Sequence, residues 1–353
     1  MEQAAARSSE NKYFSRQVTL AMKGTGIIWM LVHHLFCCFP EFVEKYKVSS
    51  RLISMDGVMV ISTFGKVCVA FFVFLSAYGM TVSLTQSCEK DTWVLCRYKK
   101  LAGSFFFIYV VSILTCFLRS DGLAVYTGEG PAKAVWYMLV DGLGIAHLLG
   151  TPTYNETWWY MSVAVLLIFV LPILVRIYQK FGISLVVAAA FAQNIGVART
   201  TFTMYLFPAV LGIYLASEEL IFRIRQAQPK QKWYIFAGNT AVVLCLSYIR
   251  LFWGYYDLMD GLLALTVAVE FFILLDIWKL PFYLLRMIGK YSMYIFLIHT
   301  LLLEYYFTDF IYAPGNWVLI TGKLLLVSLA VSVVLDRLQK TLQIKPGGLS
   351  KGA

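Results

Sequence analysis

The segment Met22-Lys-Gly-Thr-Gly-Ile-Ile-Trp-Met-Leu-Val-His-His-Leu-Phe36 carries a lysine at its start and two adjacent histidines near its end. The residues between these groups are almost all apolar. With its flanks, the run is long enough to cross a bilayer, which needs about 20 residues at a rise of about 1.5 Å each. An ionisable side chain at that depth is costly, so it usually faces a bundle interior or a water-filled cavity. The two histidines are therefore candidate functional residues, and the alternative is a pair that merely reaches the outer headgroups.

The composition of the whole chain indicates a membrane protein. Of its 353 residues, 59% are hydrophobic and only 14% are charged, with a mean hydropathy of +0.70, whereas soluble chains have about 25% charged residues. The formal net charge of +10 does not indicate nucleic-acid binding, because lysine and arginine in cytoplasmic loops explain it better. The seven cysteines show no CxxC spacing and lie mostly in apolar runs, which indicates small buried side chains rather than disulfides or a zinc site.

Apolar windows predict an all-α polytopic protein with about ten transmembrane helices in one bundle. The predicted spans are 18–38, 60–86, 101–118, 157–177, 181–198, 200–217, 233–251, 258–278, 283–306 and 316–336. Only Arg199 and its neighbours separate the fifth span from the sixth. The same windows define an N-terminal segment 1–17, a transmembrane domain 18–338 and a C-terminal tail 339–353, and no removable signal peptide is recognisable before the first span.

The positions of lysine and arginine predict that both termini are cytoplasmic. With the N-terminus inside, 21 of the 30 basic residues fall on inner segments, while the outer loops carry mostly aspartate and glutamate, as the positive-inside rule requires. The longest connection, about 119–156, then lies outside. Its glycine-rich part, 136–147, is too short to span the bilayer, which predicts a re-entrant or interfacial segment.

Lys23 and His34 are 11 residues apart, about 16 Å along a helix and roughly on one face of it. His33 is rotated by about 100° and is expected to point elsewhere. This arrangement suits an extended anionic donor that is anchored near the cytoplasm and reacts in the outer half of the membrane. The alternative is a lysine placed by the positive-inside rule together with an interfacial histidine.

Two further groups flank predicted spans. Arg97, Lys99 and Lys100 precede the third span on the cytoplasmic side, where clustered cations can bind phosphate groups. Trp158 and Trp159 open the fourth span from outside, and a tryptophan pair can form a platform for a sugar face. Each group has a structural alternative, since inner basic residues and interfacial aromatic belts are common in membrane proteins.

His299 lies deep in the ninth predicted span, at a depth similar to that of His34. An unpaired charge there would be costly. His299 is therefore either a neutral core residue, hydrogen-bonded to serine or tyrosine, or a residue that lines a cavity. With four histidines and no HExxH or CxxC spacing in the chain, no metal site is predicted.

Taken in order, these motifs resemble the acyltransferase family 3 membrane proteins, which O-acylate cell-surface glycans and small acceptors. The resemblance covers nearly the whole chain. Its elements are Lys-Gly-x-Gly-Ile…His-His in the first span, Phe71-Phe-Val-Phe-Leu-Ser-Ala-Tyr-Gly79 in the second, the basic run before the third, Thr157-Trp-Trp-Tyr-Met-Ser162 at the fourth and Ile288-Gly-Lys-Tyr-Ser-Met-Tyr…Leu-Ile-His299 in the ninth. The family's ten-helix architecture agrees with the span count, and the resemblance implies a multi-pass protein of a bacterial cell membrane.

The resemblance also implies roles for the residues above. The family's first-helix motif is an arginine, ten intervening residues and a histidine. That register makes His34 the catalytic base and places Lys23 in the arginine position, on the acyl-coenzyme A side. The family's basic cluster is implicated in holding the coenzyme A phosphates, which maps to Arg97, Lys99 and Lys100.

On the acceptor side, Trp158, Trp159 and His299 are predicted to bind substrate. The chain departs from the family pattern at two positions. Lys23 cannot make the bidentate fork of an arginine. Many members have a glutamate five residues after the tryptophan that opens the fourth span, where this chain has Ala164, so a mechanism that needs this carboxylate does not apply.

The predicted activity is transfer of an acyl group, with acetyl preferred, from acyl-coenzyme A to a hydroxyl of a glycan or small extracytoplasmic acceptor. Acyl-coenzyme A is a co-substrate, and neither a tightly bound cofactor nor a nucleic acid is expected. The expected partners are membrane lipid, the hydroxyl acceptor and, as further candidates, polysaccharide-assembly proteins. Two alternatives stay open. One is a transporter or flippase that uses the histidines as proton relays, with broken helices in two related halves; the other is a glycan polymerase that uses the outer loop 119–156.

Overall fold

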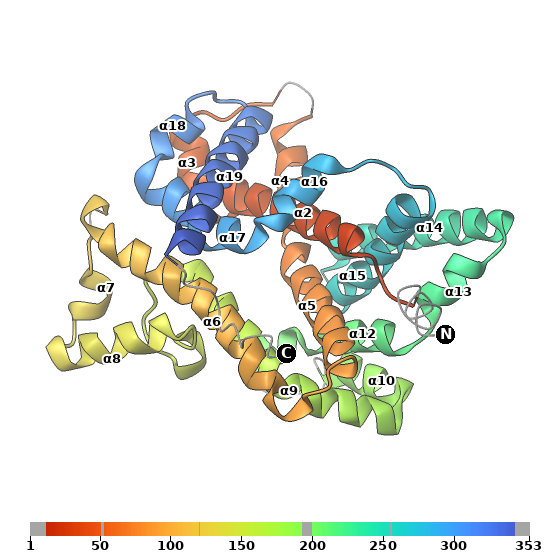
Figure 1. Cartoon of the computed structure of the whole chain (residues 1–353). Helices are drawn as coiled ribbons and strands as arrows, with labels where there is room; N and C mark the ends of the chain where they lie inside the picture. Colours follow the sequence, from red (N-terminus) through yellow and green to blue (C-terminus); the bar gives the residue numbers. More distant parts are fainter. Residues whose placement is uncertain (1–11, 51–52, 120, 193–199, 255, 343–353) are drawn as a thin grey trace. The chain divides into compact units, whose positions relative to one another are not determined.

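The computed structural model describes residues 12–50, 53–119, 121–192, 200–254 and 256–342. Within these ranges the chain is helical, and an isolated bridge between Ser49 and Asn316 is the strand-like feature (Figure 1). Parts of four predictions lie outside the described residues: 1–11 of the N-terminal segment, 120 of the connection 119–156, 193–199 at the fifth span and its boundary, and 343–353 of the tail.

Six helical segments of the described chain are long and apolar enough to cross a membrane. They are Arg16–Cys38, Met55–Thr85, Glu156–Phe181, Pro229–Trp253, Asp257–Ile277 and Trp317–Thr341. They coincide with the predicted first, second, fourth, seventh, eighth and tenth spans. A segment of this kind must satisfy every backbone polar group internally, which a helix does. The protein is thus a multi-pass, helical membrane protein.

These segments consist of the following helices, some of which end in π-helical turns. In chain order they are α2 (Arg16–His33) with η1 (His34–Cys38), α4 (Met55–Gly65), α5 (Val67–Thr85), η4 (Glu156–Trp158) with α9 (Trp159–Phe181), α14 (Pro229–Trp253), α15 (Tyr256–Phe272) with η5 (Ile273–Ile277), and α19 (Trp317–Thr341). Shorter connecting helices are α3 (Pro40–Lys45), η2 (Cys116–Leu118), α7 (Ala124–Thr127), α8 (Pro131–Gly142), η3 (His147–Leu149), α11 (Thr201–Met204), α13 (Leu220–Gln226) and α18 (Thr308–Tyr312).

In the part of the chain that the structure describes, the other four predicted spans do not correspond to helices that are both long and apolar enough to cross a membrane. The third corresponds to α6 (Lys90–Leu114), whose first turns are charged, and the fifth and sixth to α10 (Ile183–Ala192) and α12 (Leu206–Ser217). The ninth is not continuous: α16 (Tyr283–Lys290) ends before Tyr291, and α17 (Ser292–Leu301) continues into the π-helical turn η6 (Leu302–Tyr306). Within the described residues, six of the ten predicted spans therefore correspond to helical segments that are long and apolar enough to cross a membrane, and four do not.

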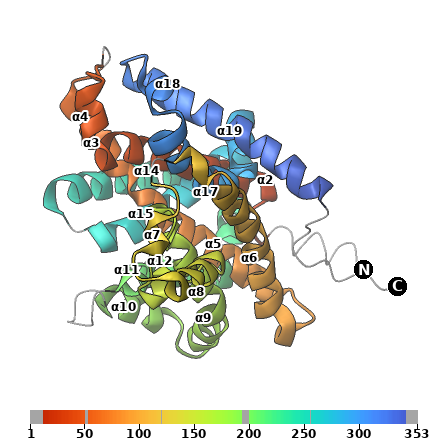
Figure 2. The same cartoon turned by 90° about the vertical axis from the view of Figure 1, so that its left-hand side faces the viewer.

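The chain packs as two compact units. Unit 1 contains Met1–His33, Met59–Ser87 and Val170–Ser292, and unit 2 contains His34–Val58, Cys88–Phe169 and Met293–Ala353. In unit 2, α18 packs beside α19, near the end at which α19 begins (Figure 2). The connection predicted to lie outside also belongs to unit 2, where α8 exposes Val135, Trp136 and Leu139 and buries Asp141. One apolar face on a short helix is typical of a segment that lies in the membrane interface.

Glycines let α2 and α16 approach each other closely in unit 1 (Figure 1). A Cβ atom added at Gly24 would lie 2.0 Å from the carbonyl oxygen of Leu285, and one added at Gly289 would lie 1.8 Å from that of Leu20. Two helix backbones can touch at this separation only if both positions lack a side chain. The glycines next to Lys23 and Lys290 in the sequence motifs thus serve helix packing.

Replacing Gly289 with alanine is expected to destabilise the protein, because the new methyl group overlaps the backbone of α2. Overpacking of this kind costs about 1–3 kcal/mol. Gly238→Ala on α14 is the matched control, since nothing lies within 4 Å of the added Cβ and alanine favours a helix by about 0.5–1 kcal/mol. Thermal denaturation in detergent should move in opposite directions for the two variants. An unchanged or raised midpoint for Gly289→Ala would contradict the packing described here.

Candidate active site

His34 opens the π-helical turn η1, directly after α2 ends at His33. Such turns are rare and occur frequently at functional sites, because they disturb the regular hydrogen bonds of the helix. Here the hydroxyl of Tyr312 donates to the carbonyl oxygen of Leu35 at 2.8 Å. Phe36 is fully buried and packs against Trp317, with ring centroids 6.5 Å apart. The turn that carries His34 is therefore fixed within unit 2.

His34 and His299 form a hydrogen-bonded pair in unit 2. Nδ1 of His34 lies 2.6 Å from Nε2 of His299, and the two ring planes differ by 9°. The ring centroids are 4.8 Å apart, which is 2.2 Å more than the distance between the two nitrogens. This difference is about one ring radius for each imidazole, so both nitrogens lie close to the line that joins the centroids. The rings thus lie edge to edge in nearly one plane, so the hydrogen bond is close to linear.

The neighbours of His299 hold it in place. Its ring is fully buried, and its Nδ1 lies 2.8 Å from the carbonyl oxygen of Phe296. The next residue, Thr300, accepts a 2.8 Å hydrogen bond from the side-chain amide of Asn155. On the other side, Nε1 of Trp158 donates to the carbonyl oxygen of Leu297 at 2.9 Å. The segment that opens α9 is therefore hydrogen-bonded to α17 on both sides of His299 in the sequence.

The adjacent histidine has a different partner. His33 belongs to unit 1, and its Nδ1 lies 2.9 Å from the carbonyl oxygen of Ser62. This carbonyl lies near the end of α4, where the helix is interrupted before α5. The two side chains point in different directions, as the rotation along a helix predicts. His33 contacts the backbone through this nitrogen, whereas His34 contacts a second imidazole.

The residues predicted to bind the donor lie on two helices. Lys23 is on α2 in unit 1 and is partly buried. Arg97, Lys99 and Lys100 are on α6 in unit 2, where the two lysines are exposed and the guanidinium of Arg97 lies over the ring of Trp93, 5.6 Å from its centroid. Binding of coenzyme A by either group stays a prediction.

The two tryptophans predicted to bind the acceptor differ in their surroundings. Trp158 is 2% exposed and packs edge-on against Phe105, with centroids 5.1 Å apart. Its ring is enclosed, so its visible role is to join α9 to α6 and α17. Trp159 is partly exposed and lies beside His147, with centroids 6.2 Å apart. Of the pair, Trp159 offers the accessible aromatic surface.

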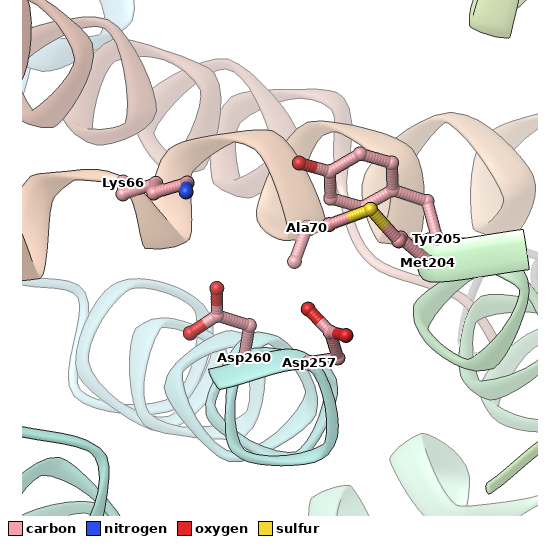
Figure 3. A pocket seen from close by; sticks show the side chains of 6 residues that line it. All are labelled: Lys66, Ala70, Met204, Tyr205, Asp257 and Asp260. Atoms are coloured by element: carbon pink, nitrogen blue, oxygen red, sulfur yellow. The ribbon is translucent and has the colours of Figure 1, made fainter. Parts of the chain in front are cut away.

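Sequence reasoning missed a buried charged cluster in unit 1. Arg250 is fully buried, forms an ion pair with Asp260 and donates to the carbonyl oxygen of Thr63 at 3.1 Å. Figure 3 shows Lys66 facing the carboxylates of Asp257 and Asp260 across a pocket. The cavity of about 20 Å³ holds roughly one water molecule. A signal was present, because Arg250 and Asp260 stand at facing ends of two consecutive predicted spans.

A second cluster lies in unit 2, at the connection that is predicted to lie outside. The guanidinium of Arg119 lies between the rings of Tyr154 and Tyr305, 4.3 and 4.0 Å from their centroids. Arg119 also donates two hydrogen bonds to Asp121, at 2.7 and 2.6 Å, and these bonds hold the pKa of the Asp121 carboxyl below its ordinary value. Because these contacts join parts of the connection to one another and, through Tyr305, to η6, the cluster serves packing.

The described residues contain no group of three or more His, Cys, Asp or Glu side chains placed to hold a metal ion. Comparison with protein families finds one described as an acyltransferase domain, whose model matches residues 21–337. This match spans nearly the whole chain and includes both His34 and His299. The comparisons found no significant match among curated proteins or solved structures.

Proposed function

The chain belongs to the acyltransferase 3 family of membrane enzymes, and on this basis we propose that it transfers an acyl group from acyl-coenzyme A to a hydroxyl acceptor. The acyl group proposed is acetyl, and the acceptor is a glycan or a related molecule outside the cytoplasm. Acyl-coenzyme A acts as a co-substrate, and the reaction takes place in a bacterial cell membrane.

The observation that supports this function best is the hydrogen-bonded pair of His34 and His299 in unit 2. A general base must be held in one orientation and in one protonation state to remove a proton efficiently. His34 meets this requirement, because its Nδ1 is engaged by a fully buried ring. It also occupies the histidine position of the family's first-helix motif.

In the proposed reaction, neutral His34 takes the proton of the acceptor hydroxyl as the oxygen attacks the thioester carbonyl. The carbon–oxygen bond forms, the carbon–sulfur bond breaks, and the proton passes from His34 to the departing thiolate. Donor and acceptor bound together react in an effectively unimolecular step, which supplies much of the rate. Neither an oxidant nor a metal is needed for this exchange.

For the arrangement in the membrane, we propose ten spans with both termini cytoplasmic. Basic residues on the inner side, Lys23, Arg97, Lys99 and Lys100, would bind the coenzyme A phosphates through charge-assisted hydrogen bonds. The acceptor would approach from outside, where Trp159 has accessible aromatic surface. Burial of Trp158 argues against direct contact between its ring and a sugar.

A transporter is the second candidate, because unit 1 contains features that transporters use. The helix is interrupted between α4 and α5, and the nearby carbonyl oxygen of Thr63 accepts from the buried Arg250. Interrupted helices and intramembrane ion pairs often mark ion pathways. A transporter would, however, show no dependence of coenzyme A release on an acceptor.

The test is acyl transfer by the purified protein in lipid nanodiscs. Radiolabelled acetyl-coenzyme A is supplied with a panel of polysaccharide fragments, lipid-linked sugars and small polyols. We expect release of coenzyme A that requires an acceptor, matched by an equal amount of an acylated product that hydroxylamine cleaves. A folded protein that neither binds acetyl-coenzyme A nor releases coenzyme A with any acceptor would refute the proposed function.

A further inference from the structure

The hydrogen bonds around His299 determine which of its nitrogens carries the proton. Nδ1 of His299 lies 2.8 Å from the carbonyl oxygen of Phe296 and 3.2 Å from that of Ile295. A carbonyl oxygen can only accept a hydrogen bond, so Nδ1 must be the donor. In the neutral ring the lone pair is then on Nε2, which is the atom that faces His34.

The tautomer of His34 follows from that of His299. A second proton on His299 would place a positive charge on a fully buried ring, which is costly. Nε2 of His299 is therefore the acceptor, and Nδ1 of His34 is the donor across the 2.6 Å contact. With Nδ1 protonated, the basic lone pair of neutral His34 is on Nε2.

We infer that His299 is a positioning residue that selects Nε2 of His34 as the proton-accepting atom. This inference rests on the proposed function. Its ring fixes the plane of His34 through the edge-to-edge contact, and its lone pair stabilises the imidazolium that forms when His34 takes the acceptor's proton. A carboxylate performs the same two tasks for the histidine of serine hydrolases. Here a neutral imidazole performs them, so no buried negative charge is required.

This role replaces the sequence-based prediction that His299 binds substrate. A residue whose ring is fully buried and whose two nitrogens are both engaged within the protein has no polar atom left for an acceptor sugar. Its effect on the reaction must therefore pass through His34. The neighbouring contacts of Asn155 and Trp158 with α17 maintain its position.

The first test compares two replacements of His299. Glutamine can place an oxygen acceptor near the position of Nε2, whereas leucine cannot. We expect His299→Leu to lower kcat by about 100-fold with little change in the KM for acetyl-coenzyme A, and His299→Gln to recover most of that loss. If both replacements keep the activity of the unmodified protein, or both lose it equally while folded, the inference is wrong.

The second test combines His299→Leu with His34→Ala. Because His299 acts through His34, the double variant should be no slower than His34→Ala alone. Additive losses would show that His299 acts by another route. Absence of turnover in the unmodified protein would instead refute the proposed function, so the two failures are distinguishable.

A spectroscopic measurement reads the tautomer in the unmodified protein itself. Nitrogen-15 labelling of histidine in the unmodified protein reports which ring nitrogen is protonated, with His34→Ala used only to assign the signal. We expect His34 with Nδ1 protonated and Nε2 unprotonated at a pH where the ring is neutral. The opposite tautomer would overturn the inference directly.

Discussion

His34→Ala is expected to lower kcat for acyl transfer by about 1,000-fold, within the range that a positioned general base contributes. The substitution removes the ring that would take the proton of the attacking hydroxyl. It should leave the affinity for acetyl-coenzyme A nearly unchanged, because the proposed phosphate contacts are to other, cationic side chains. The rate is measured as single-turnover formation of labelled product, and the affinity by equilibrium binding of labelled donor.

The matched control is His33→Ala, one residue earlier in the chain. His33 contacts the carbonyl oxygen of Ser62 in unit 1, so its loss should affect stability near the start of α5 more than the chemical step. We expect this variant to keep kcat close to that of the unmodified protein when it is folded. Equal losses in the two variants would contradict the assignment of His34 as the base.

Arg250→Met is expected to lower the stability more than Gly289→Ala or Lys340→Met does, because it leaves the carboxylate of Asp260 buried without the guanidinium that pairs with it. Breaking a buried ion pair from one side costs about 3–5 kcal/mol. The substitution also removes the donor to the carbonyl oxygen of Thr63. Denaturation of the purified protein in micelles, followed by circular dichroism, measures the change.

Two comparisons separate the ion pair from a general effect of mutation. Arg250→Met combined with Asp260→Leu should recover much of the stability, since a buried pair can be replaced by apolar residues at little cost. Lys340→Met removes a pair with Asp336 in which the lysine side chain is 67% exposed, and such surface pairs contribute about 0–1 kcal/mol. A double variant less stable than Arg250→Met would disprove the explanation.

A span can be predicted correctly when the residues that define it all lie within one short window of sequence. Segments such as Pro229–Trp253 contain a long apolar window, so a window of sequence is enough to recognise them. The break at Tyr291 could not be predicted in this way. The helix before the break, α16, packs backbone to backbone on α2 through Gly289, and a window of sequence around Tyr291 does not contain α2.

The same distinction applies to the candidate site. The sequence alone identified His34 as a candidate and predicted that His299 lies at a similar depth in the membrane, because depth follows from position along a span. It did not show that the rings touch, since 265 residues separate them. Arg250 and Asp260 were missed, although only ten residues separate them, because the sequence does not show that their side chains are buried together.

By itself, the sequence determined that this protein is a helical membrane protein of an acyltransferase family, because apolar composition and ordered motifs are properties of the chain as written. The tertiary structure decided which partner each histidine has. A hydrogen bond requires two atoms within about 3 Å and in line, and only the packing of η1 against α17 in unit 2 brings Nδ1 of His34 to Nε2 of His299. The chemistry of an imidazole is set by that contact, since the protonated nitrogen leaves the other one as the base.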